Sequence, residues 1–265
     1  MKDLLNTAIK ASIDAGKAIM DVYATDFDIE IKGDDSPLTT ADKKANAVIM
    51  SYLEQTSVPI ISEENKRIPF YERSQWKRCW IVDPLDGTKE FIKRNGEFTV
   101  NIALIAEGRP LLGVIYVPVS KTLYFTNHKA DTSYKFVLSD ESMPIADILE
   151  KASEIAPLAA ITDPVKVVGS RSHLNEDTKV FISEIEKKHT VEIVSKGSSL
   201  KFCLVAEGEA HIYPRYAPTM EWDTAAGQAI CEAVGLVVTE EKTGKSLRYN
   251  KENLLNPYFV VSAKN

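Results

Sequence analysis

The chain has 265 residues, of which 44% are hydrophobic and 26% are charged, and its formal net charge is −6. This length and apolar content allow a sizeable buried core in one large domain or two. The negative net charge argues against an extended set of contacts to nucleic-acid phosphates, so we expect no nucleic acid polymer as a partner. It does not exclude a small phosphorylated molecule held through a metal ion.

The sequence predicts a cytoplasmic protein. Charged and apolar residues are interleaved at the amino terminus, and the longest later apolar run, residues 111–119, is too short to cross a bilayer. The three cysteines, Cys79, Cys203 and Cys231, form no Cys-x-x-Cys pair, which indicates buried reduced thiols and argues against zinc. Association with the cytoplasmic face of the inner membrane and the oligomeric state stay open, and no obligate protein partner is evident.

The first predicted element is an amphipathic helix over residues 3–23, where apolar residues recur at helical spacing. The alternating segment at residues 26–32 predicts a half-exposed strand. A second helix is expected to begin at Thr39 or Thr40, which places Asp42 in its first turn. An acid there favours the helix dipole, and this is the simplest role for Asp42.

Two short apolar runs deliver acidic residues to places where strand pairing is expected to stop. Residues 58–62 predict a strand that ends at Glu63, and residues 80–82 predict a strand that ends at Asp83. In the string Asp-Pro-Leu-Asp-Gly-Thr, residues 83–88, proline removes a backbone donor and glycine permits a tight turn, so we expect the chain to turn here. Such a string is also an ordinary polar turn.

The chemistry of residues 83–88 nevertheless favours a cation. Asp83, Asp86 and the carbonyl of Leu85 would crowd one small volume, where like charges repel unless a positive charge separates them. Hard divalent cations accept this combination of carboxylate and carbonyl oxygens. Gly87 and Thr88 follow at once and offer backbone N–H groups and a hydroxyl to an anion bridged by the cations.

The remaining elements predict a meander followed by an alternating α/β half. We interpret Asn95-Gly96 as a hairpin turn. Strands are expected at residues 98–105, 111–117 and 122–126, followed by a connection at 129–163 with a weak helix at 146–155. The second half predicts strands at 165–170, 191–194 and 211–215, helices at 176–187, 198–206 and 221–234, and two short strands at the end.

Two separated signatures resemble those of the inositol monophosphatase superfamily. They are residues 83–88 and the string Trp-Asp-Thr-Ala-Ala-Gly at residues 222–227, and the likeness extends over nearly the whole chain. The longer strings at residues 89–101 and 197–208 resemble the branch of 3'(2'),5'-bisphosphate nucleotidases. Ser62 departs from the pattern, because many members have glycine before the paired acids.

The resemblance implies an α/β fold of the αβαβα type, the five-layer sandwich of the inositol monophosphatases and fructose-1,6-bisphosphatases. It implies a single phosphatase domain over residues 1–265, with a metal-binding α+β half at about 1–130 and an α/β half at about 160–265 that completes the nucleotide site. The implied reaction is magnesium-dependent removal of the 3'-phosphate of adenosine 3',5'-bisphosphate, by direct in-line attack of water, in sulfur metabolism. Inhibition by lithium is also implied.

The resemblance further implies two or three Mg²⁺ ions bound to a common set of oxygen atoms. These come from the carboxylates of Glu63, Asp83, Asp86 and Asp223 and from the carbonyl of Leu85. One ion would activate water and a second would stabilise the leaving oxygen. Thr88, paired with Asp42, is expected to orient or deprotonate that water, and Asp42 also helps to hold a third ion.

Substrate contacts are implied at two groups of residues. Glu63, Asp86, Gly87, Thr88 and Asp223 belong to the metal and phosphate end of the site. His173, Ser198, Lys201 and Arg215 match the positions that hold AMP in the family, and the second phosphate of a bisphosphate most naturally pairs with Lys201 or Arg215. Taken one at a time, each of these residues also has an ordinary structural or solvated role.

Three other functions remain as alternatives. An inositol or sugar phosphate phosphatase would share the same metal signatures. A haloacid-dehalogenase-type phosphatase would use an aspartate as a covalent nucleophile, although its two acids are two positions apart and Asp83 and Asp86 are three apart. A non-catalytic protein that binds a cation or nucleotide would hold the ion without turnover.

Overall fold

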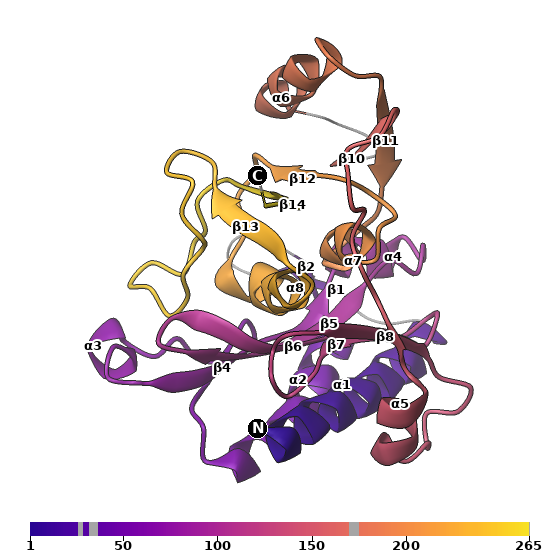
Figure 1. The fold of residues 1–265 in the computed structure, drawn as a ribbon. Coiled ribbons are helices and arrows are strands. Elements are labelled where there is room, and N and C mark those ends of the chain that lie inside the picture. The colour runs from indigo at the N-terminus through magenta and orange to yellow at the C-terminus, as the bar shows by residue number, and fades with distance from the viewer. Residues whose placement is uncertain (26–28, 32–36, 170–174, 265) are drawn as a thin grey trace.

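Two amphipathic helices form the outer layer at one side of the molecule. The computed structural model describes residues 1–25, 29–31, 37–169 and 175–264. Helix α1, Lys2–Tyr23, packs along helix α2, Thr40–Leu53, and together they cover one face of a large sheet (Figure 1). The predicted helices are therefore confirmed. Of the strand expected at residues 26–32, the described part is β1, Ile29–Ile31, which pairs with β2, Pro37–Thr39.

The large sheet has seven strands in the spatial order β3-β4-β5-β6-β7-β8-β9. Their bounds are Ile60–Ser62, Arg78–Asp86, Thr99–Ala106, Arg109–Val117, Thr122–Thr126, Ser133–Val137 and Ser153–Glu154. β3 runs parallel to β4, and every later neighbour is antiparallel, so the predicted meander is confirmed. β8 and β9 correct the prediction of a connection over residues 129–163, and the helix predicted at 146–155 ends before β9.

The side chains of this sheet alternate between two separate cores. On β4, Trp80 and Val82 join the core beneath α1 and α2, whereas Cys79 and Ile81 join the core on the opposite face. This is the two-residue period of an extended strand. The three cysteines are buried and free, as predicted.

The second half of the chain covers the opposite face of the large sheet. Helices α7, Leu200–Ala206, and α8, Glu221–Ala233, lie on that face, with a three-stranded sheet beyond them (Figure 1). That sheet has the order β12-β14-β13, with the bounds Tyr213–Arg215, Phe259–Ala263 and Leu236–Glu240. Strands β10, Val165–Gly169, and β11, Val191–Ser195, pair in parallel beneath the outermost helix α6, Glu176–Glu186. The layers follow the predicted αβαβα order.

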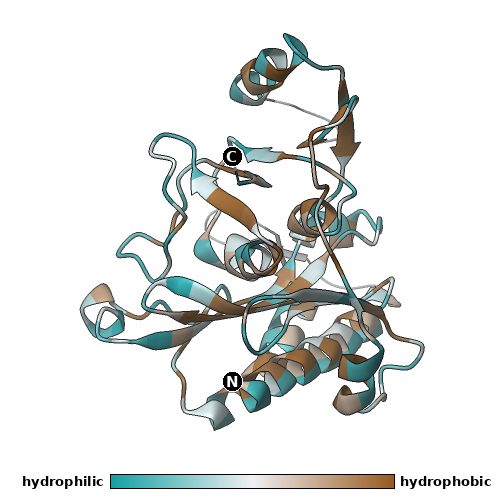
Figure 2. Cartoon of the chain, in the orientation of Figure 1, coloured by the Kyte–Doolittle hydropathy of each residue, from teal (hydrophilic) through white to brown (hydrophobic). Residues whose placement is uncertain are grey.

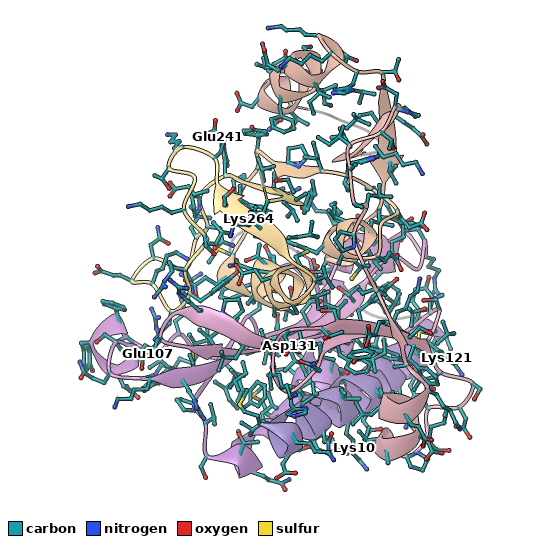
Figure 3. All side chains as sticks on the ribbon, in the orientation of Figure 1. Lys10, Glu107, Lys121, Asp131, Glu241 and Lys264 are labelled. Carbon is teal, nitrogen blue, oxygen red and sulfur yellow. The ribbon has the colours of Figure 1, made fainter. Side chains whose placement is uncertain are left out.

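Four short elements complete the fold. They are the 3₁₀ helix η1, Glu54–Thr56, and the helices α3, Phe70–Arg73, α4, Thr88–Ile92, and α5, Ile145–Lys151. In Figure 2, apolar residues gather where helices meet the large sheet. Charged side chains such as Lys10, Glu107 and Glu241 are exposed on the outside, as Figure 3 shows. None of the helices in the described part of the chain is long and apolar enough to cross a membrane.

The predicted hairpin at Asn95-Gly96 is wrong. These residues connect α4 to β5, and β5 pairs with β4 and β6 rather than with a strand directly before it. The Asn95 carboxamide oxygen accepts the backbone N–H of Glu97 at 2.9 Å, and Gly96 has a φ of +75°. The local turn chemistry was therefore recognised, but the preceding segment is helical rather than extended.

Helix α8 approaches the large sheet so closely that its contact requires glycine. A Cβ atom at Gly113 on β6 would lie 2.4 Å from the carbonyl oxygen of Ala226 and 2.7 Å from the Cβ of Ala229. On the other side of α8, a Cβ at Gly227 would lie 2.3 Å from the ring of Phe202 on α7. Small residues at these positions set how close α8 lies to β4 and β5.

We expect Gly113→Ala to lower the free energy of unfolding by about 1–3 kcal/mol, as overpacking of a core commonly does. The nearest obstacle is backbone, which cannot rotate away. Urea unfolding measures the loss. Arg109→Ala is the control, because Arg109 is an exposed residue of the same strand and its replacement should change stability by no more than about 0.5 kcal/mol. A Gly113→Ala variant as stable as the wild type would contradict the close approach.

Candidate active site

A β-bulge in β4 brings two aspartates to one face of the large sheet. Asp83 pairs with Asn101 of β5 and Asp86 pairs with Thr99, with a register shift between them. Three steps along β4 therefore match two steps along β5, and the additional residue makes a bulge. The predicted end of strand pairing at Asp83 is wrong in this respect, because β4 remains extended through Asp86 and pairing resumes after the bulge.

The bulge reverses the alternation of side chains. In a regular strand, residues three positions apart point to opposite faces. Here Leu85 joins Val82 in the core beneath α1 and α2, whereas Asp86 lines a cavity together with Asp223 of α8. Within the bulge, the backbone N–H of Leu85 donates to Oδ1 of Asp83 at 3.1 Å. Asp83 and Asp86 consequently lie close together, although their spacing alone suggests otherwise.

Asp83 is the most buried of a group of five carboxylates, with 2% of its surface exposed. Burial raises its pKa well above the usual value, and the neighbouring carboxylates of Glu63, Asp86, Asp223 and Asp42 raise it further. The five acids come from four parts of the chain, because Asp83 and Asp86 share the strand β4. Glu63 directly follows β3 and donates its backbone N–H to the carbonyl of Val82 at 3.2 Å, and Asp42 is a buried residue in the first turn of α2.

Asp223 is the acid that α8 contributes to this group of carboxylates. It lies in the first turn of the helix, and its Oδ2 accepts the backbone N–H of Met220 at 2.8 Å. Burial and then the carboxylate of Asp86 raise the pKa of Asp223 to about 7, against the opposing effect of the Met220 hydrogen bond. Asp223 therefore caps the N-terminus of α8, as acids commonly do, and it also lies close to the other acids.

Ser62, which departs from the family pattern, is used to support the turn before Glu63. Its hydroxyl donates to the carboxamide oxygen of Asn46 on α2 at 2.8 Å and accepts the backbone N–H of Glu64 at 3.4 Å. Ser62 thus links the end of β3 to α2 by a hydrogen bond that glycine, which lacks a side chain, could not make.

The donor set fits a hard divalent cation. Carboxylate oxygens from several elements are concentrated around one buried acid, and their mutual repulsion is the kind that an ion such as Mg²⁺ relieves. Among the described residues, no three acids, histidines or cysteines already stand in a finished metal-binding arrangement. Ion binding would therefore draw the carboxylates closer together, and the metal assignments of Glu63, Asp83, Leu85, Asp86 and Asp223 stay predictions.

The turn after the acids is built on glycine. Gly87 has a φ of +97°, and a Cβ there would lie 3.3 Å from Phe98 Cα and 3.3 Å from Ser198 Cβ. Thr88 follows as the first residue of α4 and is half-buried. The structure thus places Gly87 directly against the loop before α7, and the expected pairing of Thr88 with Asp42 stays a prediction.

A cavity of about 560 Å³ lies against this group of acids. Six of the predicted site residues line it, namely Asp86, Gly87, Ser198, Lys201, Arg215 and Asp223. Segments far apart in the sequence therefore meet here, and the volume is in the range of small-molecule sites. His173 lies outside the described residues. Glu63, Asp83 and Thr88 are not part of the cavity wall.

Four cationic side chains line the same cavity, Lys93, Lys196, Lys201 and Arg215, and the last two are predicted site residues. Lys201 Nζ donates to the carbonyl of Ser198 at 2.9 Å, and burial lowers the pKa of Lys201 while the carboxylate of Asp86 opposes this effect. The Nε atom of Arg215 is buried and has no hydrogen-bond partner among the described residues. An unsatisfied buried donor of this kind is costly unless a ligand accepts its hydrogen bond.

Two buried polar residues beside Asp86 are not among the predicted site residues. Asn101 and Ser199 have 1% of their surfaces exposed, and both donate to Oδ2 of Asp86. For Asn101 a signal was available, because it interrupts the apolar strand between Val100 and Ile102. For Ser199 none was, since a serine before a helix is an ordinary start signal.

Comparisons with known proteins cover the whole chain. A model of the inositol monophosphatase family matches residues 1–264. Proteins named 3'(2'),5'-bisphosphate nucleotidase CysQ from Escherichia coli K12 and Shigella flexneri are 44% and 43% identical over 265 residues, covering 98% of this chain and 99% of each relative. The crystal structure of CysQ from Bacteroides thetaiotaomicron is 49% identical, with a TM-score of 0.89 over 100% of this chain and 98% of that one.

The raised pKa values predict that the metal-free protein loses stability as pH rises. The folded state of an acid with a raised pKa holds its proton more tightly than the unfolded state, so stability falls between the ordinary value near 3.8 and the folded value, about 7 for Asp223. In EDTA we expect the free energy of unfolding to be about 1–2 kcal/mol lower at pH 8 than at pH 5. Urea unfolding at both pH values measures it.

Asp223→Asn should reduce this pH dependence, because it removes one of the titrating carboxylates. Glu241→Gln, at an exposed acid, is the matched control and should behave as the wild type. Mg²⁺ should stabilise the protein more at pH 8 than at pH 5. Stability in EDTA that is constant or rises over this range would contradict the electrostatic description.

Proposed function

The chain belongs to the inositol monophosphatase family, and from this membership we propose that it is a 3'(2'),5'-bisphosphate nucleotidase that converts adenosine 3',5'-bisphosphate to AMP and phosphate. Full-length relatives at 43–44% identity carry that name, and the fold and residues of the site are compatible with the reaction. The enzyme is a phosphoric monoester hydrolase.

The observation that carries the proposal is the pairing of opposite charges in one cavity. We take the part of its wall at Asp86 and Asp223 as the acidic end. Lys201 and Arg215 also line the cavity, as do the charged side chains Glu90, Glu97, Lys93 and Lys196. A bisphosphate needs two such places, because one phosphate is hydrolysed and the other must be held by a cation. A small monophosphate uses only the acidic end with its metal ions. The buried, unsatisfied Nε of Arg215 supports an anionic occupant.

Magnesium is the cofactor that the acidic end fits. We propose that two or three ions bind among Glu63, Asp83, Asp86 and Asp223 and the carbonyl of Leu85. When bound, the metal would neutralise the phosphate and make water nucleophilic near neutral pH. Thr88, paired with Asp42, would then orient the attacking water in line with the bond to the leaving 3'-oxygen, or accept a proton from it.

The bond changes balance without a covalent enzyme intermediate. The water oxygen forms the new bond to phosphorus as the bond from phosphorus to the 3'-oxygen breaks, one water proton passes to the enzyme and the leaving oxygen takes up a proton. Backbone N–H groups at Gly87 and Thr88 are suited to the non-bridging phosphate oxygens. Ser198, Lys201, Arg215 and His173 hold the remainder of the nucleotide.

A phosphate-release assay over a panel of substrates tests the assignment. We expect turnover of adenosine 3',5'-bisphosphate that is abolished by EDTA and restored by Mg²⁺, and much weaker turnover of inositol 1-phosphate and fructose 1,6-bisphosphate. Preference for the inositol or sugar ester would instead identify a related phosphatase. Binding of nucleotide without any phosphate release would identify a non-catalytic protein.

Lys201→Ala and Arg215→Ala test the second phosphate site. Each variant should raise KM for the bisphosphate by an amount equivalent to about 1.5–3 kcal/mol, the usual range for a charge-assisted hydrogen bond, with a smaller effect on kcat. Turnover of a small monophosphate should change little. The measurement is steady-state kinetics on adenosine 3',5'-bisphosphate and on inositol 1-phosphate.

Lys242→Ala serves as the control, because this lysine is exposed. It removes one positive charge from the surface and should leave both KM values unchanged. Equal losses on the two substrates in Lys201→Ala and Arg215→Ala would argue against a dedicated second phosphate site, while the metal-dependent phosphatase reaction would stand.

A further inference from the structure

Two side chains outside the cavity wall donate hydrogen bonds to the same oxygen of Asp86. Ser199 Oγ lies 2.7 Å and Asn101 Nδ2 lies 3.3 Å from Asp86 Oδ2. Asn101 Nδ2 also donates to Ser199 Oγ at 2.7 Å. Among the described residues, both hydrogen bonds to this carboxylate reach Oδ2, so its Oδ1 stays available for another partner.

The direction of these hydrogen bonds follows from the carboxylate of Asp86, which can only accept, so the NH₂ group of Asn101 faces Asp86. Thr99 Oγ1 donates to the carboxamide oxygen of Asn101 at 3.0 Å and supports this orientation. Ser199 accepts one of those N–H groups and has a single proton to give. Its distance to Asp86 is shorter than its 3.1 Å distance to the carbonyl oxygen of Asp223.

This arrangement depends on burial and on the bulge. Thr99, Asn101 and Ser199 have 0–1% of their surfaces exposed, so water does not compete for their hydrogen bonds. Thr99 and Asn101 are the partners of Asp86 and Asp83 across the bulge. Ser199 precedes α7, and its neighbours Ser198 and Lys201 line the cavity. It therefore connects the segment that carries Ser198 and Lys201 to the bulge of β4 that carries Asp83 and Asp86.

We propose that Ser199 and Asn101 are positioning residues, which hold Oδ2 of Asp86 so that Oδ1 is presented to a metal ion. This inference rests on the proposed magnesium-dependent function but assigns residues to it that contact neither substrate nor metal. Partners that orient a metal-binding carboxylate commonly change metal affinity or activity 10–100-fold when they are lost. Thr99 acts one step further away, by fixing the Asn101 amide.

The test compares Ser199→Ala and Asn101→Ala in metal binding without nucleotide. Titration of the full-length protein with Mn²⁺, followed by electron paramagnetic resonance, reports affinity independently of turnover. We expect each substitution to weaken binding about 10-fold. The double variant should lose less than the product of the two single effects, because both groups serve one oxygen.

Kinetics separates positioning from a general structural effect. In both variants the half-saturating Mg²⁺ concentration should rise, while KM for the bisphosphate at saturating Mg²⁺ should stay near the wild-type value. Ser199→Thr retains the hydroxyl and should restore the Mn²⁺ affinity. A merely structural role would lower stability and leave the metal dependence alone.

Ser133→Ala is the matched control. Like Ser199, Ser133 is a buried serine. Its hydroxyl donates to the carbonyl of Ile230 on α8 at 2.8 Å, and it lies away from Asp86. Its loss should lower stability without changing Mn²⁺ affinity. Wild-type Mn²⁺ affinity in both Ser199→Ala and Asn101→Ala would overturn the proposal.

The outcomes for positioning and for the proposed function are separable. Reduced Mn²⁺ affinity in the variants supports positioning even if the wild type prefers another phosphate ester in the substrate panel. Wild-type Mn²⁺ affinity in both variants overturns positioning even if the wild type is an efficient bisphosphate nucleotidase.

Discussion

Electrostatic repulsion among the carboxylates around Asp83 is the constraint on which the rest of the structure depends. Glu63, Asp86, Asp223 and Asp42 raise the pKa of this buried acid, and none of them lies next to it in the sequence. Isolated from the fold, such a group would separate, because like charges are costly where little water screens them. Packing elsewhere must therefore hold it together, and a bound cation would relieve the repulsion.

That packing is concentrated at α8. The helix touches β6 where Gly113 leaves no side chain and touches Phe202 of α7 at its own Gly227. A helix held this close brings Asp223 to the acids of the sheet, while its Ala225 and Ala226 fill the core. Because interiors pack at crystal-like density and transmit displacements, substitutions on the far side of α8 are expected to displace Asp223 as well.

The cavity extends from this acidic group to cationic residues on other elements. Activation of the ester and binding of the second phosphate are therefore assigned to different residues. In the proposed function, the acids bind metal and activate the ester, a task that other phosphatases of the family would share. Lys201 and Arg215 belong to the second half of the chain and are proposed to hold the second phosphate of the substrate. Ser199 lies between the two groups through its hydrogen bonds to Asp86 and Asn101, so the two halves of the site are joined by buried polar contacts as well as by apolar packing.

The sequence by itself determined the helices α1, α2, α6 and α8, the antiparallel meander and the acidic signatures, because local periodicity and turn chemistry act over a few residues. It also indicated a cation at residues 83–88 from the crowding of acids. Only the tertiary structure decided that β4 bulges instead of ending, since the register depends on β5, and only it placed Asn101 and Ser199 on one oxygen of Asp86. Contacts between residues 98 or 113 positions apart arise from the packing of layers, which no local pattern records.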